Sequence, residues 1–309
     1  MYAAALVVAG ALLTAALPSS AAAAAATDPV PAPDGPVSGR AVPALRGTAA
    51  AAAAPRGAER SSAVRAAGTV GKSAGIQTIT PWTGALHTVW GAFPTVVSDG
   101  AQANHTVKPD LHISASDPDI IYAPTLFPSG KSCIEVTTFY WQGGNGVGAW
   151  DWCAVNPGFA AVAWIDTNFV NTYTVPFNGL RSYTVRDVQT NATTNSWTAY
   201  LYNFTTSSWD ALFTSADPAK LTNGGGGWDM FEVYTDYNPA TGEGYYCTET
   251  YGTMWWATGI QIKVGSTWQA LTPSNSDVTP VGNVHSTDFG CYSLSFTLQN
   301  PNNNWQVTH

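Results

Sequence analysis

Residues 224–238 read GGGGWDMFEVYTDYN, so four glycines lead directly into an aromatic strand that carries acidic residues. Side chains alternate between the two faces of a strand. Met230, Glu232, Tyr234 and Asp236 therefore share one face, and the residues between them form a largely apolar face suited to a core. Residues 75–309 contain only four glutamates, and three of them (Glu232, Glu243 and Glu249) lie in this stretch or just after it, which makes Glu232 the first candidate for a chemical or binding centre.

The composition divides the chain into three parts. Residues 1–26 hold an apolar run and a block of alanines, a pattern typical of a secretory signal peptide, although no Lys or Arg precedes the run. Residues 27–74 are rich in Ala, Pro, Gly and Ser and contain no aromatic residue, so we expect a disordered linker or propeptide. All thirteen tryptophans lie beyond it, which predicts a single folded domain over residues 75–309.

The charge follows the same division. Residues 1–74 carry six cations and three carboxylates, a net charge of +3, and because the whole chain carries −8, residues 75–309 carry −11. A domain this acidic repels phosphate backbones, which excludes nucleic acid as a partner. The N-terminal apolar run is short for a membrane span. We therefore expect a secreted protein that does not span a membrane and is a monomer.

Four cysteines lie in the domain, at Cys133, Cys153, Cys247 and Cys291. An even number in an exported chain predicts two disulfides, and four cysteines allow three pairings. Proximity in the sequence favours Cys133–Cys153 and Cys247–Cys291. No Cys-x-x-Cys motif is present, which argues against a zinc or redox site.

Segments with strand-like alternation recur along the domain with Gly, Asn, Pro and Ser between them. The clearest are residues 134–141, 160–165, 181–188, 196–203, 209–213, 245–247, 255–264 and 293–298. Almost no helical periodicity is visible. This pattern predicts an all-β fold, a sandwich or a barrel of antiparallel strands.

Two strings in the domain resemble a known superfamily. WTAYLYNFTTSSWDAL (residues 197–212) followed by WDMFEVYTDYN (residues 228–238) is similar to the concanavalin A-like lectins and glucanases, in texture across about residues 130–270. This resemblance implies an antiparallel β-sandwich of the jelly-roll type. Within the superfamily, two families resemble the chain most.

The first family is the legume-type lectins, which hold metal ions on a Glu-x-Asp-Thr-aromatic-x-Asn loop. Glu232, Asn238 and the later Glu243 match that loop by position, whereas Tyr234 stands where the bridging aspartate would be. Calcium prefers carboxylate and amide oxygens, so Asp236, Asn238 and Glu243 are candidate calcium ligands. The alternative is that Asp236 and Asn238 cap a hairpin turn.

The second family is the eqolisin-type glutamic peptidases, whose catalytic pair is one Gln and one Glu. Trp228, Glu232 and Tyr234 resemble their acidic aromatic strand, and Gln142 is the candidate partner of Glu232, although the family's own strings are absent. The resemblance implies hydrolysis with an acid optimum, because such a site needs a protonated carboxyl. A glycosidase would instead pair Glu232 with a second carboxylate, for which Glu249 is the candidate.

Aromatic residues suggest a third kind of site. Their flat apolar faces suit stacking on sugar rings. The candidate ligand-binding residues are Trp141, Trp150, Trp152, Trp228, Tyr234 and Trp255. The leading interpretation is a secreted protein that recognises extracellular polysaccharide through an aromatic-lined groove. The alternatives are a hydrolase on the same fold that uses Glu232, and a structural surface protein in which these aromatics form the core.

Overall fold

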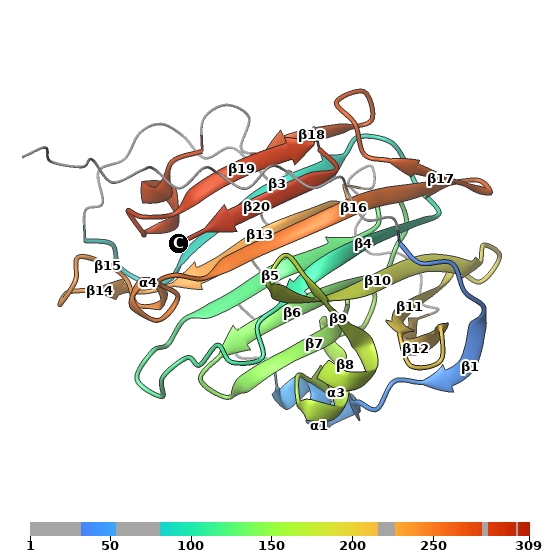
Figure 1. Ribbon diagram of the computed structural model, residues 1–309, viewed down its shortest axis with the longest axis horizontal. Coiled ribbons are helices and arrows are strands. Elements are labelled where there is room, and N and C mark those ends of the chain that lie inside the picture. Colours follow the sequence, from blue (N-terminus) through green and yellow to red (C-terminus); the bar gives the residue numbers. More distant parts are fainter. Residues whose placement is uncertain (1–31, 54–80, 216–225, 280–283, 301) are drawn as a thin grey trace, which may run out of the picture.

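The chain folds into two β-sheets packed face to face (Figure 1). The computed structural model describes residues 32–53, 81–215, 226–279, 284–300 and 302–309. Within these residues β1 pairs with β12 in parallel, and the other strand pairs are antiparallel. The all-β, antiparallel sandwich predicted from the sequence is confirmed.

Sheet A has the strand order β1 (Val37–Ala41), β12 (Ser208–Ser215), β11 (Ser196–Asn203), β10 (Leu180–Asn191), β4 (Gly100–Val107), β16 (Met254–Val264), β20 (Asn304–Thr308) and β19 (Ser295–Asn300), with β9 (Thr174–Phe177) beside β10 and β17 (Thr267–Ala270) beside β16. Sheet B has the order β18 (Ser276–Thr279), β3 (Leu86–Pro94), β13 (Trp228–Thr235), β5 (Ile120–Phe127), β6 (Ile134–Trp141), β7 (Gly144–Asp151), β8 (Gly158–Trp164) and β2 (Leu45–Arg46). β14 (Tyr237–Asn238) and β15 (Glu243–Gly244) form a short separate hairpin. The helices of the described residues are α1 (Gly47–Ala52), α3 (Thr167–Tyr173), α4 (Tyr246–Glu249) and the 3-10 helix η1 (Ser286–Phe289).

Strand β13 lies between β3 and β5 near the middle of sheet B. Its alternation is as predicted: Phe231 and Val233 enter the core between the sheets, where Phe231 contacts Trp255 of sheet A. Trp228, Met230 and Tyr234 lie in a separate apolar cluster on the opposite side of the strand. We call this side, which faces away from sheet A, the outer face of sheet B.

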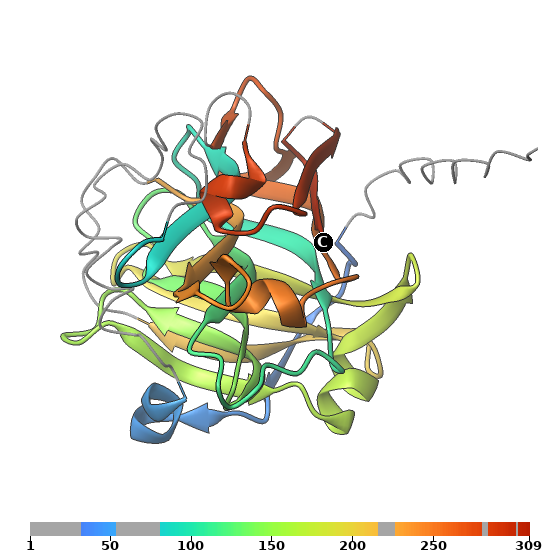
Figure 2. The same ribbon diagram turned by 90° about the vertical axis from the view of Figure 1, so that its left-hand side faces the viewer.

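The end of the sandwich near α4 differs from the prediction (Figure 2). Residues 245–247 were expected to continue a strand, but α4 begins at Tyr246. Tertiary contacts explain the difference: the Tyr246 amide donates to Asp119, and its hydroxyl donates to the Phe289 carbonyl. These long-range bonds override the strand preference of aromatic residues.

The N-terminal segment also differs from the prediction. Residues 27–74 were expected to be a disordered linker, yet residues 37–53 form β1, β2 and α1 on the sandwich. β1 pairs with β12 and β2 with β8, so sheet edges supply the backbone hydrogen bonds that the segment cannot make alone. Ala50 is buried because its small side chain fits against the sheet. The predicted signal peptide, residues 1–26, lies outside the described residues.

Both disulfides join the cysteines that sequence proximity favoured. Cys133–Cys153 ties the start of β6 to the segment after β7, with Cα atoms 5.1 Å apart. Cys247–Cys291 ties α4 to the residue that follows the turn after η1, with Cα atoms 5.7 Å apart. The predicted pairing is therefore confirmed. Among the described helices, none is long and apolar enough to cross a bilayer.

Candidate acid–base site on the outer face of sheet B

Glu232 lies on the outer face of sheet B and is fully buried. Its Oε1 lies 2.8 Å from Nε2 of His87 on the neighbouring strand β3. In the register of these strands Tyr234 is opposite His87 and Glu232 is opposite Val89, so Glu232 and His87 are diagonal neighbours on one face. The pairing of β3 with β13 therefore brings together two residues that are 145 positions apart in the chain.

The imidazole of His87 is held on two sides. It stacks on the ring of Tyr234, with ring centroids 4.2 Å apart and planes 11° apart. A proton on Nε2 that is donated to Glu232 leaves Nδ1 as an acceptor. The side chain of His87 is 25% exposed, whereas that of Glu232 is 0% exposed, so solvent reaches the imidazole and not the carboxylate. Among the described residues, Nδ1 of His87 has no hydrogen-bond partner.

A second histidine–carboxylate pair shows what a purely structural pair looks like. His105 lies 2.9 Å from Asp229 in the core between the sheets, and both are buried. Asp229 also accepts from the Trp305 indole at 2.8 Å, and His105 contacts the Tyr183 hydroxyl at 3.2 Å. Burial raises the pKa of Tyr183 well above its usual range. This pair is enclosed, so the partly exposed Glu232–His87 pair is the one placed to react.

Glu135 is a further buried carboxylate on the outer face. Its Oε1 accepts hydrogen bonds from the Thr125 hydroxyl and, at 2.9 Å, from the Trp228 indole. Its Oε2 accepts from the Trp152 indole at 3.0 Å. Glu135 was not among the site residues predicted from the sequence. A glutamate near the start of a strand with alternating apolar residues was the signal that could have found it.

The predicted partners of Glu232 lie elsewhere. Gln142 is exposed in the turn between β6 and β7. Glu232 is opposite Tyr122 and Tyr122 is opposite Phe139, so Gln142 lies two strands away and three residues further along, roughly 14 Å by strand geometry. Glu249 is on α4, where both carboxylate oxygens lie 2.9 Å from the Ser114 amide. His87, which was not among the partners predicted for Glu232, is the one that the structure places against it.

The aromatic candidates do not line an open groove. Four tryptophans of the predicted set are buried, at positions 150, 152, 228 and 255, and so is Tyr234. Trp255 belongs to the core between the sheets, and the indoles of Trp152 and Trp228 are turned toward Glu135. Trp141 is the one partly exposed member of the six. These positions give no support to polysaccharide recognition by stacked aromatic rings.

The candidate calcium ligands lie around the β14–β15 hairpin. Asn238 is opposite Glu243, and its side-chain oxygen accepts from the Ala240 amide, as in a turn cap. Glu243 accepts from the Tyr292 amide at 2.6 Å. Asp236 donates its own amide to Asp119. The turn-capping alternative thus accounts for Asn238, and calcium binding stays a prediction.

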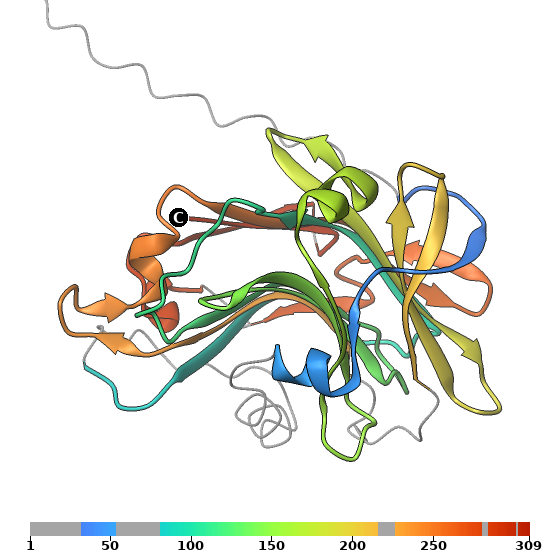
Figure 3. The ribbon, with the colours of Figure 1, turned by 90° about the horizontal axis from the view of Figure 1, so that it is seen from below.

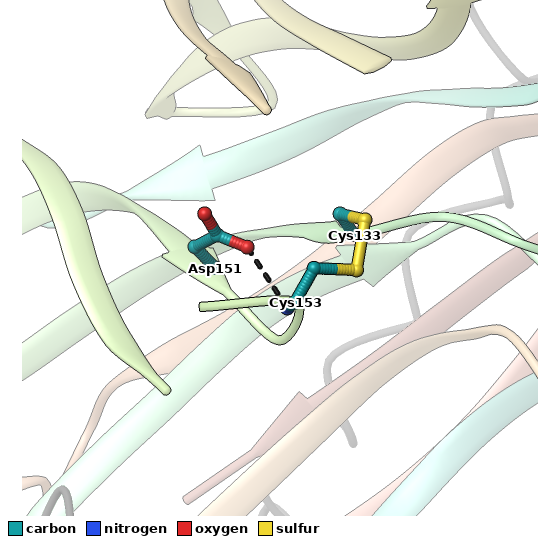
Figure 4. Close-up of side chains that lie close together, drawn as sticks. All are labelled: Cys133, Asp151 and Cys153. Atoms are coloured by element: carbon teal, nitrogen blue, oxygen red, sulfur yellow. Dashed lines mark hydrogen bonds between the residues drawn. A yellow bond between two sulfur atoms is a disulfide. The ribbon is translucent and has the colours of Figure 1, made fainter. Parts of the chain in front are cut away.

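Two groups of three potential metal ligands occur among the described residues, and each contains a disulfide. In one of them Asp151 accepts from the Cys153 amide at 2.9 Å, beside the Cys133–Cys153 bridge (Figure 4). The other combines Glu243 with Cys247 and Cys291. Because a disulfide sulfur is not a thiolate, neither group offers the ligand set that a metal ion needs.

Comparison with known proteins gives structural likeness alone. No protein-family model matches the chain, and no curated protein sequence matches it. Solved structures similar to it include scytalido-glutamic peptidase with a peptide-based transition state analog, at 13% identity and a TM-score of 0.38, over 73% of this chain and 99% of that one. SCP-B, a member of the eqolisin family of peptidases in a complex with the tripeptide Ala-Ile-His, is 11% identical with a TM-score of 0.41, over 73% of this chain and 99% of that one. Scytalido-glutamic peptidase with a transition state analog inhibitor is 11% identical with a TM-score of 0.41, over 72% of this chain and 100% of that one. Likeness at this level carries no argument about activity, so the function is argued from the residues of this chain.

Proposed function

We propose that the chain is an exported hydrolase in which Glu232 and His87 form the acid–base pair. The observation that carries the proposal is the contact of 2.8 Å between a fully buried carboxylate and a partly exposed imidazole. Glu232 fixes the orientation of the ring and stabilises the positive charge that forms when Nδ1 takes a proton from an attacking water. Tyr234 holds the ring from its face.

The substrate class that fits this pair is an acyl compound, an amide or an ester. Glycosidases need two carboxyl groups on opposite sides of the scissile bond. Here the partner of Glu232 is an imidazole, and the carboxylate of Glu249 is engaged with the Ser114 amide. The contacts of His87 among the described residues are with Glu232 and Tyr234, so water rather than a side chain is the nucleophile.

Secretion is part of this proposal, and calcium binding stays a separate prediction. Two disulfides are compatible with an oxidising compartment, which supports secretion. Calcium at Asp236, Asn238 and Glu243 stays a prediction, and a calcium-dependent rise in melting temperature would test it. Polysaccharide binding is not proposed, because the aromatics chosen for it are mostly buried.

The test compares the full chain with His87→Gln, Glu232→Gln and Glu249→Gln on denatured casein, p-nitrophenyl esters and mixed polysaccharides from pH 3 to 8. We expect new peptides or p-nitrophenol from the parent. For the first two variants we expect the activity to fall at least about 100-fold, because general acid–base catalysis supplies about that much. Glu249→Gln should keep its activity, and circular dichroism should show that all three variants fold.

The pH profile separates two mechanisms. A neutral imidazole base gives a rate that rises with pH, whereas a rate maximum at the acid end would favour the glutamic-type mechanism, in which a protonated Glu232 acts as the acid. Full activity of His87→Gln would overturn the pair proposed here. New reducing ends with no acyl cleavage would overturn the substrate class, and retention of polysaccharide without cleavage would restore the binding interpretation.

A further inference from the structure

A second concave site lies at the end of the sandwich where β4 finishes. It is a cavity of about 770 Å³ between the segment after β4, the β9–β10 hairpin and α4. The hairpin and α3 project from sheet A, away from sheet B (Figure 3). The cavity shares no lining residue with the Glu232–His87 pair. Its volume falls within the range of small-molecule sites, which is about 300–1,000 Å³.

Two cations line this cavity in a domain that has few of them. Residues 75–309 contain six Lys and Arg residues, and two of these, Lys108 and Arg181, line the cavity. Arg181 is opposite Val107 in the register of β10 with β4, so Lys108 follows one residue later on the adjacent chain segment. Among the described residues, neither the ammonium nor the guanidinium has an ion-pair or hydrogen-bond partner.

The carboxylates at the cavity do not neutralise these cations. Glu249 turns its carboxylate toward the Ser114 amide, with both oxygens at 2.9 Å. Asp110 is exposed. Burial lowers the pKa of Lys108 more than the nearby Asp110 raises it. A half-buried, unpaired ammonium in an acidic domain is costly, and an anion in the cavity would offset that cost.

The rest of the lining is largely apolar. Val107, Leu111, Leu180 and two prolines form most of it, together with His112, Gly179 and Thr253, and Leu111 is almost fully buried. Ligand sites of this kind use apolar walls for contact area and a few charged groups for orientation. The lining therefore fits a ligand that combines one negative charge with an apolar body.

We propose that this cavity binds small organic carboxylates with an apolar side group, with the carboxylate against Lys108 and Arg181 and the apolar part along Leu111 and Leu180. Arg181 offers the planar fork of donors that matches a carboxylate, and Lys108 adds a second charge. The proposal does not depend on the hydrolase activity, since it uses none of the same residues.

The test uses N-acetyl-leucine as the probe and N-acetyl-leucinamide as its uncharged counterpart, with the full chain in a titration calorimeter. We expect the carboxylate to bind and the amide to bind at least tenfold more weakly. Arg181→Gln and Lys108→Gln should each weaken carboxylate binding at least tenfold. Lys263→Gln removes the same charge from β16, outside the cavity, and should leave binding unchanged. Acetate and inorganic phosphate show whether charge alone is enough.

Three outcomes would overturn the proposal. They are equal binding of acid and amide, equal weakening by Lys263→Gln, and no detectable binding of the acid at millimolar concentration. Binding of phosphate but not of N-acetyl-leucine would replace the carboxylate with a phosphate ligand and refute the apolar half of the proposal. If Arg181→Gln fails to fold, Lys108→Gln carries the test, because among the described residues the Lys108 side chain makes no hydrogen bond or ion pair that its loss would break.

Discussion

The buried carboxylate of Glu135 accepts at least three hydrogen bonds among the described residues. Its donors are the Thr125 hydroxyl and the indoles of Trp152 and Trp228. The change Glu135→Gln replaces one acceptor oxygen by an NH2 group, which leaves at least one buried indole N–H without an acceptor. We expect the free energy of unfolding to fall by about 1–3 kcal/mol, the usual cost of an unsatisfied buried polar group. Urea unfolding followed by tryptophan fluorescence measures the change.

The matched control is Glu243→Gln. Glu243 is half-buried and accepts from one backbone amide, that of Tyr292, and the remaining side-chain oxygen of Gln can keep that bond. Its free energy of unfolding should therefore change by less than about 0.5 kcal/mol, as for most surface substitutions. Equal effects of the two changes would show that the indole contacts of Glu135 contribute nothing.

The residues of the proposed site differ in how far the sequence alone could predict them. Alternation alone placed Glu232 and Tyr234 on one face and Phe231 on the other, because the period of a strand is a local property. His87 was not predicted as the partner, because its contact with Glu232 depends on the register between β3 and β13, which single-strand patterns do not encode. Gln142 was chosen by resemblance, and the strand order of sheet B separates it from Glu232.

At the scale of elements, the close pairing of β3 with β13 positions the proposed acid–base pair. Gly91 on β3 is opposite Met230, and a Cβ added there would collide with the Asp229 carbonyl and lie 2.5 Å from the Met230 Cα. We expect Gly91→Ala to lower the free energy of unfolding by about 1–3 kcal/mol, as overpacking does. It should also lower the activity by displacing His87. Urea unfolding and the hydrolase assay measure the two effects.

Gly158→Ala on β8 is the control, since an added Cβ there meets nothing within 4 Å. It should leave the midpoint unchanged or raise it slightly, because alanine restricts the unfolded chain. If Gly91→Ala were as stable and as active as Gly158→Ala, close strand approach at Gly91 would not be what sets the geometry of the pair.

Elements with strong alternation were predictable, and elements held by distant contacts were not. β6 and β11 have the bounds that the pattern gave, residues 134–141 and 196–203. The strands of residues 37–46 pair with β12 of one sheet and β8 of the other, at the same edge of the sandwich, and nothing in an Ala-rich and Pro-rich segment reveals those partners. The helix at residues 246–249 depends in the same way on Asp119 and Phe289.

The whole molecule holds several carboxyl groups in places that favour their protonated form. Burial, and then the neighbouring Asp119, raise the pKa of Asp117 to about 7. Burial raises the pKa of Asp119 to about 6, although hydrogen bonds from Thr235, Asp236 and Tyr246 lower it. Burial also raises the pKa of Asp187 well above its usual range. These groups make the stability of the fold depend on pH, and because all three pKa values are raised, they do so in the same direction.

A raised carboxyl pKa means that the folded state binds more protons than the unfolded state between about pH 4 and pH 7. The stabilisation is fully present below the unfolded pKa and is lost as the pH rises through the folded pKa, so we expect the melting temperature to fall from pH 4.5 to pH 8. Asp117→Asn keeps an acceptor for the Asp119 amide but removes the charge. It should raise the melting temperature at pH 8 and reduce the slope of melting temperature against pH. Asp110→Asn, which removes an exposed carboxylate, should change neither. Calorimetric scans from pH 4.5 to pH 8 measure the melting temperature and its slope against pH. A parent protein that gains stability as the pH rises would contradict the raised pKa values, because it would mean that these aspartates are stabilised as anions.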